Sequence, residues 1–281
     1  MSNVKIVTDS SAILSDEEVE TYNVTVIPMS LTIDGTLYQD GVTIGRNEFL
    51  DKMKVAKELP TTSQPPIGEF TKVYENLVAD GASVISVHMS GGLSGTVNAA
   101  KQAAELVDGD ITVVDSTFID RAEAFQVLTA AELAQQGATV PEILEQVVLT
   151  REKSVSHIFV AEMDNLVKGG RISKTAGAVA SLLNIHAGLH LADGGFAIDV
   201  KARGAKAIKK YMHKIIDDMQ ALPVGMRRID VSHAGVPEKA NELTEALQTA
   251  FPDVTVHTFE TSPNSATHAG AGALAIAYET K

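Results

Sequence analysis

Short apolar runs and amphipathic stretches alternate along the first half of the chain. An apolar run of about four to eight residues between turn residues is typical of a buried strand, and apolar positions at helical spacing are typical of a helix. This pattern predicts strands at 4–7, 24–31, 83–88 and 111–114, and helices that begin at 15 and span 47–57, 67–80, 98–107 and 119–136. Strand, loop and helix follow one another, which predicts an α/β fold with a parallel sheet and helices on both faces.

The pattern changes near residue 150, where strands and helices alternate less regularly. Here we expect strands at 157–161, 196–201, 228–233, 254–260 and 273–278, and helices at 175–183, 205–220 and 238–251. At 281 residues the chain is longer than one compact domain usually is. We therefore expect two α/β domains, an N-terminal domain over 1–155 and a C-terminal domain over 156–281.

Hydroxyl-rich loops adjoin the expected helices of the first half, at 9–11, 61–63 and 92–96. In an open parallel sheet, ligands lie beyond the carboxyl ends of the strands, where helix N-termini present free N–H groups. Each loop can therefore offer hydroxyl and amide donors to a carboxylate or a phosphate. Ser and Thr before a helix are also common helix caps, so position alone leaves both roles open.

The formal net charge is −13, with 36 Asp and Glu against 23 Lys and Arg. This charge repels phosphate backbones, and only 5% of the residues are aromatic, so we expect no nucleic acid partner. Cysteine is absent, which excludes disulfides, thiolate zinc sites and cysteine nucleophiles. The sequence has neither the apolar region of a signal peptide nor an apolar run of about 18 residues. We therefore expect a cytoplasmic protein without an integral membrane segment.

Two motifs approach known catalytic or metal sites but lack a required residue. Segment 92–96 is close to the nucleophile elbow of hydrolases, but Thr96 replaces the last glycine, and the Gly-Lys of a P-loop is missing. His186 and His190 have the i, i+4 spacing of zinc ligands. However, Ala187 replaces the glutamate of the metalloprotease pattern, and no third ligand is evident. We expect no bound metal.

Seven short segments follow one another along nearly the whole chain, and their order is specific although each is weak alone. They are V-T-D-S-S at 7–11, T-T-S-Q-P at 61–65, S-G-G-L-S-G-T at 90–96, V-D-S at 114–116, L-V-K-G-G-R-I at 166–172, K-A-R at 201–203 and H-A-G-A-G-A-L at 268–274. In these segments the sequence resembles the DegV family, the fatty-acid-binding proteins that serve bacterial fatty acid kinase.

The resemblance implies that the chain binds one long-chain fatty acid, such as palmitate, between its two domains and takes no other cofactor. Thr62 and Ser94 match the residues that hydrogen-bond the carboxylate of the fatty acid. His268 matches the histidine that approaches the same head group from the second domain. Thr61 and Gly95 flank these positions as further ligand or partner contacts.

The resemblance also implies a fatty acid kinase as partner, to which a protein without turnover of its own presents the bound lipid for phosphorylation. Arg171 and Arg203 match basic residues near the site where the family meets its kinase. Four positions depart from the family pattern. Gly91 stands where a second serine is common, His186-Ala187 replaces Lys-Pro, and Ala271 replaces a proline. These departures leave the predicted carboxylate donors intact, and they bear on kinase coupling and on the preferred length of the acyl chain.

Two other functions are compatible with the same residues. Ser94, His268 and Asp9 can form a hydrolase-like triad, although the order Asp, Ser, His along the chain is unusual. Alternatively, His268 or His233 can carry phosphate, because DegV-like folds are distantly similar to sugar-transport phosphocarriers.

Overall fold

The computed structural model describes residues 3–172 and 185–281. The helix predicted at 175–183 lies outside the described residues. Within the described ranges, no helix combines the length and the apolar character needed to cross a lipid bilayer.

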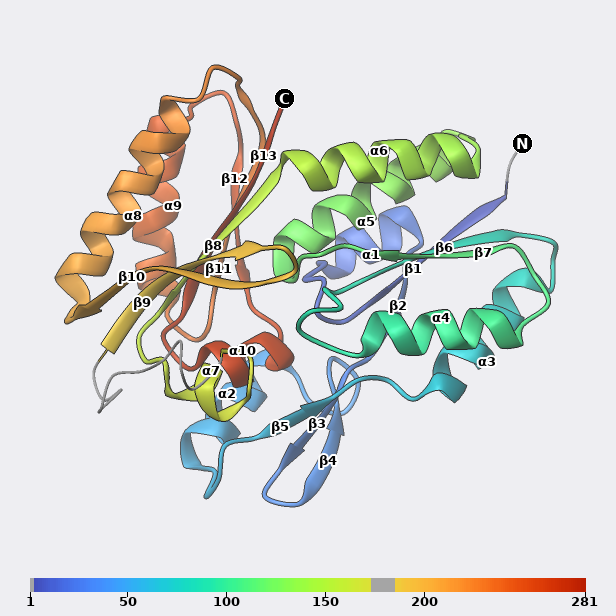
Figure 1. Cartoon of the computed structure of the whole chain (residues 1–281), viewed down its shortest axis with the longest axis horizontal. Coiled ribbons are helices and arrows are strands. Elements are labelled where there is room, and N and C mark those ends of the chain that lie inside the picture. The colour runs from blue at the N-terminus through green and yellow to red at the C-terminus, as the bar shows by residue number, and fades with distance from the viewer. Residues whose placement is uncertain (1–2, 173–184) are drawn as a thin grey trace.

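Four parallel strands form the sheet of the N-terminal half, in the order β2-β1-β6-β7. The strands are β1 (Val4–Asp9), β2 (Thr25–Ile27), β6 (Ser83–His88) and β7 (Ile111–Asp115). Apolar side chains pack α3 (Ile67–Val78) and α4 (Thr96–Leu106) against one face. On the other face lie α1 (Asp16–Tyr22), α5 (Asp120–Gln135) and α6 (Val140–Lys153). The predicted α/β fold, with a parallel sheet between two helical layers, is confirmed (Figure 1).

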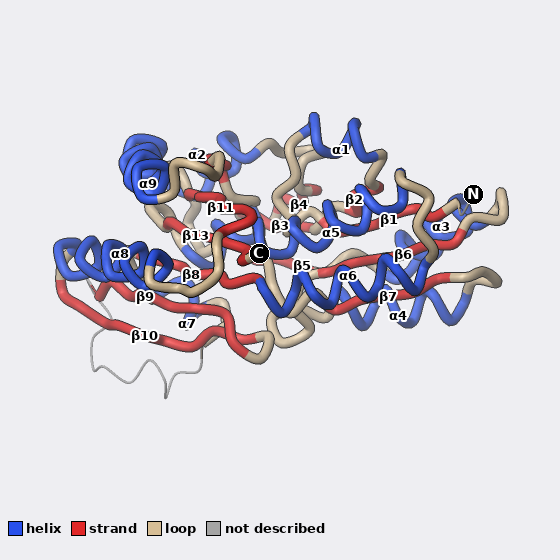
Figure 2. The backbone as a smooth tube through the Cα atoms, turned by 90° about the horizontal axis from the view of Figure 1, so that it is seen from above, coloured by secondary structure: helices blue, strands red, loops and turns tan. Residues whose placement is uncertain are grey.

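Six strands form the second sheet, in the order β10-β9-β8-β13-β11-β12, and only β11 and β12 are parallel to each other. Its strands are β8 (Ser154–Val160), β9 (Ile185–Ala192), β10 (Gly195–Arg203), β11 (Met226–His233), β12 (Val256–Glu260) and β13 (Leu274–Thr280). The helices α8 (Ala205–Gln220) and α9 (Pro237–Ala250) pack on one face, beside each other in Figure 2. The opposite face is turned toward the N-terminal half of the chain.

A small antiparallel sheet, β4-β3-β5, lies below the other two in Figure 1. The prediction of one continuous strand at 24–31 is wrong. Pro28 has no N–H to donate, and the chain divides there into β2 and β3 (Ser30–Ile33), which belong to different sheets. The hairpin continues into β4 (Thr36–Gln39), and α2 (Arg46–Val55) follows. Segment 61–63, predicted as a loop, is the third strand, β5 (Thr61–Ser63).

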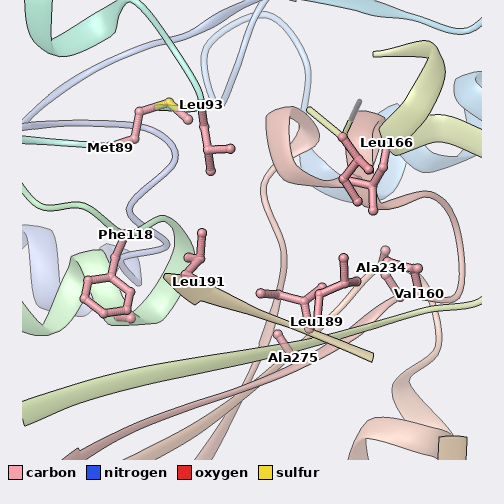
Figure 3. Packing of buried hydrophobic residues seen from close by; sticks show 14 of the residues in the cluster. Met89, Leu93, Phe118, Val160, Leu166, Leu189, Leu191, Ala234 and Ala275 are labelled. Carbon is pink, nitrogen blue, oxygen red and sulfur yellow. The ribbon is translucent and has the colours of Figure 1, made fainter. Parts of the chain in front are cut away.

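One apolar cluster joins the two halves of the chain. Figure 3 shows Met89, Leu93 and Phe118 from the N-terminal half facing Leu189 and Ala275 of the second sheet. The two larger sheets fall on either side of the predicted boundary at residue 155, whereas this cluster spans it. The division into two domains therefore stays a prediction.

Arg121, in the first turn of α5, fixes the junction between the two halves. Its guanidinium donates to Asp230 on β11 at 2.7 Å and to Glu18 on α1 at 2.8 Å. It also lies over the ring of Phe259 on β12, 3.8 Å from the ring centre. Both Arg121 and Asp230 are buried. A buried charge that loses its only strong partner is costly, so this contact holds α1, α5 and the second sheet in one arrangement.

We expect Arg121→Met to lower the free energy of unfolding by about 3–5 kcal/mol, because it leaves Asp230 buried without its partner. Urea denaturation followed by circular dichroism measures this change. The control is Lys209→Met, which removes an exposed ion pair with Glu242 and should cost less than about 1 kcal/mol. Similar small losses in both variants would contradict this role of Arg121.

Candidate functional site

A narrow, mostly apolar cavity lies between the N-terminal half of the chain and the second sheet. About 680 Å³ of space lies between the surrounding atoms, and this volume includes open solvent at the mouth. Figure 3 shows several of the buried apolar side chains around it. Its apolar lining consists of Met89, Leu93, Ile119, Ile158, Leu166, Phe196, Ala234, Ala269, Ala273, Leu274 and Ala275. A cavity with such walls suits a hydrocarbon chain better than a sugar or a nucleotide.

Strand β5 directs the Thr62 side chain into the protein. Thr62 pairs with Leu31 of β3, and paired residues place their side chains on the same face of a sheet. Leu31 is fully buried, whereas Thr61 and Ser63 on either side of Thr62 are exposed. Of the three hydroxyls at 61–63, the Thr62 hydroxyl is therefore the one that points inward. It lies 2.8 Å from Nε2 of His268.

His268 is the residue that meets Thr62 from the second half of the chain. It lies near the end of α10 (Pro263–Ala269) and lines the cavity, with its ring against Gly169, where no side chain would fit. Burial and, to a smaller extent, the charge of Arg171 lower the pKa of His268 to about 4. At neutral pH the ring is therefore uncharged and can both donate and accept a hydrogen bond.

Ser94 and Gly95 lie in the loop between β6 and α4. The Ser94 hydroxyl lies 2.8 Å from Oγ1 of Thr96 and accepts from the Thr96 N–H at 3.3 Å, so it caps the first turn of α4. The preceding residue, Leu93, lines the cavity. Gly95 packs against the side chain of Gln64 so closely that any Cβ would overlap it. The two loops predicted to bind the carboxylate are thus in direct contact.

The turn between β9 and β10 contacts the same loop, which sequence reasoning missed. The Ser90 hydroxyl donates to the carbonyl oxygen of Gly194 at 2.5 Å. A Cβ on Gly92 would lie 2.5 Å from the same oxygen, so only glycine fits there. The glycine pairs at 91–92 and 194–195 are the sequence signal for this close approach. The contact holds the second sheet against the loop that carries Ser94.

The two arginines that the resemblance places near the site have different surroundings. Arg171, just after α7 (Asp164–Lys168), lines the cavity and donates to the Gly169 carbonyl oxygen at 2.7 Å. Burial lowers the pKa of the Arg171 guanidinium, which nevertheless stays charged at neutral pH. Arg203, at the end of β10, is exposed and does not line the cavity. Its contact with a kinase stays a prediction.

The loop at 9–11 does not offer its hydroxyls to a ligand, contrary to expectation. The Ser10 hydroxyl donates to Asp40 at 2.8 Å, and the Ser11 hydroxyl donates to Glu123 at 2.7 Å. Burial raises the pKa of Asp40 to about 7 and raises the pKa of Glu123 well above its ordinary value. The hydroxyls of this loop therefore serve as hydrogen-bond donors to buried carboxyl groups of the protein itself.

The hydrolase-like triad is not assembled. The Ser94 hydroxyl pairs with Thr96 and His268 pairs with Thr62. Asp9 lies 2.9 Å from His88 instead, within the buried core of the first sheet. The triad hypothesis is therefore wrong for this arrangement, because each of its three members has another partner.

The histidines at 186 and 190 lie on β9, where an i, i+4 pair is spread along an extended strand rather than stacked on a helix. His190 pairs with Asp199 at 2.8 Å. Among residues 3–172 and 185–281, no three His, Cys, Asp or Glu side chains come together as metal ligands.

Comparison with known proteins identifies the family. The model of the DegV family, described as uncharacterised proteins, matches residues 3–281. The chain belongs to the DegV family. A DegV domain-containing protein of Streptococcus pneumoniae is 41% identical over 98% of both chains. One from Listeria monocytogenes is 40% identical over the full length of both.

Solved structures of DegV proteins share the fold over the whole chain. The structure described as DegV, a fatty acid binding protein from Bacillus subtilis, superposes with a TM-score of 0.90, 31% identity and full coverage of both chains. A fatty acid binding DegV family protein from Streptococcus agalactiae gives a TM-score of 0.89 at 27% identity, again with full coverage. The DegV fold predicted from the ordered segments is confirmed.

The lowered pKa of His268 predicts a pH-dependent stability. The folded pKa of about 4 lies below the ordinary value of 6.5, so the folded protein binds fewer protons between these pH values. His268 therefore lowers the free energy of unfolding as the pH falls from 6.5 toward 4. Above pH 6.5 the ring is neutral in both states, and this destabilisation is absent. Urea denaturation at several pH values should show a shallower loss of stability in His268→Gln than in the unmodified protein. His157, with a pKa also lowered to about 4, contributes equally to both proteins. An identical dependence of stability on pH in the two proteins would contradict the lowered pKa of His268.

Proposed function

We propose that this DegV protein binds one long-chain fatty acid, with the tail in the apolar cavity and the carboxylate at the end closed by Thr62 and His268. The observation that carries the proposal is the cavity itself, whose mostly apolar wall includes Arg171 and His268, the partner of the Thr62 hydroxyl. Two solved relatives, from Bacillus subtilis and Streptococcus agalactiae, are described as fatty acid binding proteins and support the same ligand class.

The tail would supply most of the affinity. Burial of a methylene is worth about 0.8 kcal/mol, so the roughly fourteen methylenes of palmitate give on the order of 11 kcal/mol. Association and ordering cost several kcal/mol. The remainder is enough for micromolar to nanomolar binding.

The head group requires hydrogen-bond donors, because a buried carboxylate without partners is expensive and tends to take up a proton. The hydrogen-bonded Thr62–His268 pair has one donor left for the carboxylate, because the neutral ring carries one N–H and their mutual bond uses one of the two donors. Ser94 can exchange its hydroxyl contact with Thr96 for one with the ligand. Arg171, on the cavity wall, adds a positive charge. Hydrogen bonds to a charged acceptor are roughly twice as strong as neutral ones, so these groups offset the desolvation of the carboxylate.

The same arrangement fits the two-domain interpretation, with a boundary near residue 155 and the ligand between the domains. The loop at 90–96 and strand β5 come from the first part, and α10 with the turn at Gly194 comes from the second. A ligand held in this way touches both parts and opposes their separation.

We further propose that the bound fatty acid is presented to a fatty acid kinase, so that the phosphoryl group is transferred to the lipid carboxylate and the DegV protein itself has no turnover. Arg203 is exposed at the end of β10, where it can contact an acidic surface of a partner. Arg171 lies nearer the head group, where its positive charge can hold the carboxylate and stabilise the phosphoryl group that passes to it from ATP as ADP leaves.

Thr62→Ala combined with Ser94→Ala should weaken palmitate binding at least about tenfold, because two hydroxyl donors to a buried carboxylate are lost. Isothermal titration calorimetry on delipidated protein measures the affinity. The control is Ser63→Ala, which removes an exposed hydroxyl from the same strand. An unchanged affinity in the double variant would remove both hydroxyls from the head-group site.

Arg203→Ala should slow phosphoryl transfer from ATP to bound palmitate several-fold when a bacterial fatty acid kinase is added, because a charged contact at the rim of an interface steers association. Lys72→Ala, an exposed lysine on α3, serves as the control. Radiolabelled ATP and extraction of the lipid report the rate. Equal rates in both variants would separate Arg203 from the kinase surface, and no transfer at all would contradict presentation to a kinase.

A further inference from the structure

A second polar group lies on the wall of the same cavity, about one helical turn from His268. It consists of Ser265 on α10 and His233 at the end of β11, and both side chains line the cavity. Each is only 8% exposed. Among the residues that the structure describes, neither the Ser265 hydroxyl nor Nδ1 of His233 has a hydrogen-bond partner.

Asp120 on the same wall already has hydrogen-bond partners, whereas Nδ1 of His268 has none among the described residues. Asp120, which also lines the cavity, accepts from the Thr261 hydroxyl at 2.9 Å and from the Arg121 N–H at 2.7 Å. Most buried polar side-chain atoms have a partner, and leaving one unpaired is unfavourable. Two such atoms on residues that line one cavity therefore point to a ligand atom that would pair with them.

The chemistry of the pair selects a neutral hydroxyl rather than an anion. Burial lowers the pKa of His233, so its ring is neutral at neutral pH and one ring nitrogen donates while the other accepts. A serine hydroxyl also donates and accepts. The carboxyl group of Asp120 on the same wall, with Glu260 and Glu238 near His233, makes this region unfavourable for a second negative charge.

The position of Ser265 sets where along the ligand the hydroxyl should lie. Ser265 and His268 are three residues apart on α10, so their Cβ atoms are roughly 5–6 Å apart on one side of the helix. If the carboxylate lies at His268, a group that meets Ser265 is only a few carbons along the acyl chain.

We propose that Ser265 and His233 form a hydroxyl subsite and that the preferred ligands are fatty acids hydroxylated near the carboxyl end. The proposal rests on the proposed function, because it requires the carboxylate at His268. The ligand hydroxyl donates to one member of the pair and accepts from the other. A plain acyl chain leaves both atoms unpaired, whereas a hydroxyl on the far end of the chain does not reach them.

Calorimetry on delipidated protein tests this with three ligands of equal length: palmitate, palmitate with a hydroxyl on its third carbon, and palmitate with a hydroxyl on its last carbon. The ligand hydroxylated on the third carbon should bind about tenfold more tightly than palmitate, which corresponds to about 1.4 kcal/mol. The ligand hydroxylated on its last carbon should show no gain. Ser265→Ala and, separately, His233→Leu should bring the ratio of the first two affinities close to one.

The matched control is Thr267→Val, which removes another buried hydroxyl from α10, one that already donates to the Pro263 carbonyl oxygen and does not line the cavity. This variant should keep the tenfold ratio. A ratio near one in the unmodified protein, with palmitate bound, would overturn the hydroxyl subsite alone. Failure of palmitate itself to bind would overturn the proposed function and the subsite with it. A ratio that survives both Ser265→Ala and His233→Leu would also overturn the subsite.

Discussion

The contact between Thr62 and His268 is the interaction on which the proposed site depends. It joins strand β5 to helix α10 across 206 positions of sequence, and His268 lies on the wall of the mostly apolar cavity. Each partner is held independently, Thr62 by the pairing of β5 with β3, and α10 by the Asn165 amide, which donates to the Thr267 carbonyl oxygen at 3.1 Å. Because a carboxylate can be buried only where donors meet it, the position of this pair determines where the acid end of a lipid can lie.

The distribution of charge is consistent with an anionic ligand despite the net charge of −13. Buried acids next to the first sheet pair with protein groups, as Asp9 does with His88 and Glu123 with Ser11. On the cavity wall, His268 is neutral and Arg171 near it carries a positive charge. Local hydrogen-bond donors and one nearby cation thus decide whether a small anion binds in the cavity. The electrostatic field of the net charge matters more for large polyanions.

The sequence predicted the alternation of the first half well, because apolar periodicity depends on local burial. Helix α6 was missed although Thr139 and Glu142 form a capping box that marks its start. The sequence predicts a loop at strand β5, because T-T-S has little apolar signal and becomes a strand only by pairing with β3. Strand β9 was also missed, since glycine and alanine interrupt the alternation of its apolar residues.

Within the site, sequence reasoning alone could not separate ligand donors from internal ones. Ser10 and Thr62 are both hydroxyl residues next to a strand, yet Ser10 donates to a buried carboxyl and Thr62 faces a histidine from the other half of the chain. Partners so distant in sequence are set by tertiary packing, which no local pattern reveals. The family resemblance supplied Thr62 and His268, whereas the contact of Gly92 with Gly194 and the unpaired Ser265 emerged only from the fold.

Mass spectrometry of a solvent extract from the purified protein tests the central claim most directly, combined with native mass spectrometry of the intact chain. The account predicts a long-chain fatty acid in the extract and a mass increase that corresponds to about one such molecule per chain, lost on delipidation and regained when palmitate is added. An extract without fatty acid, from a protein that also takes up no palmitate after delipidation, would contradict it.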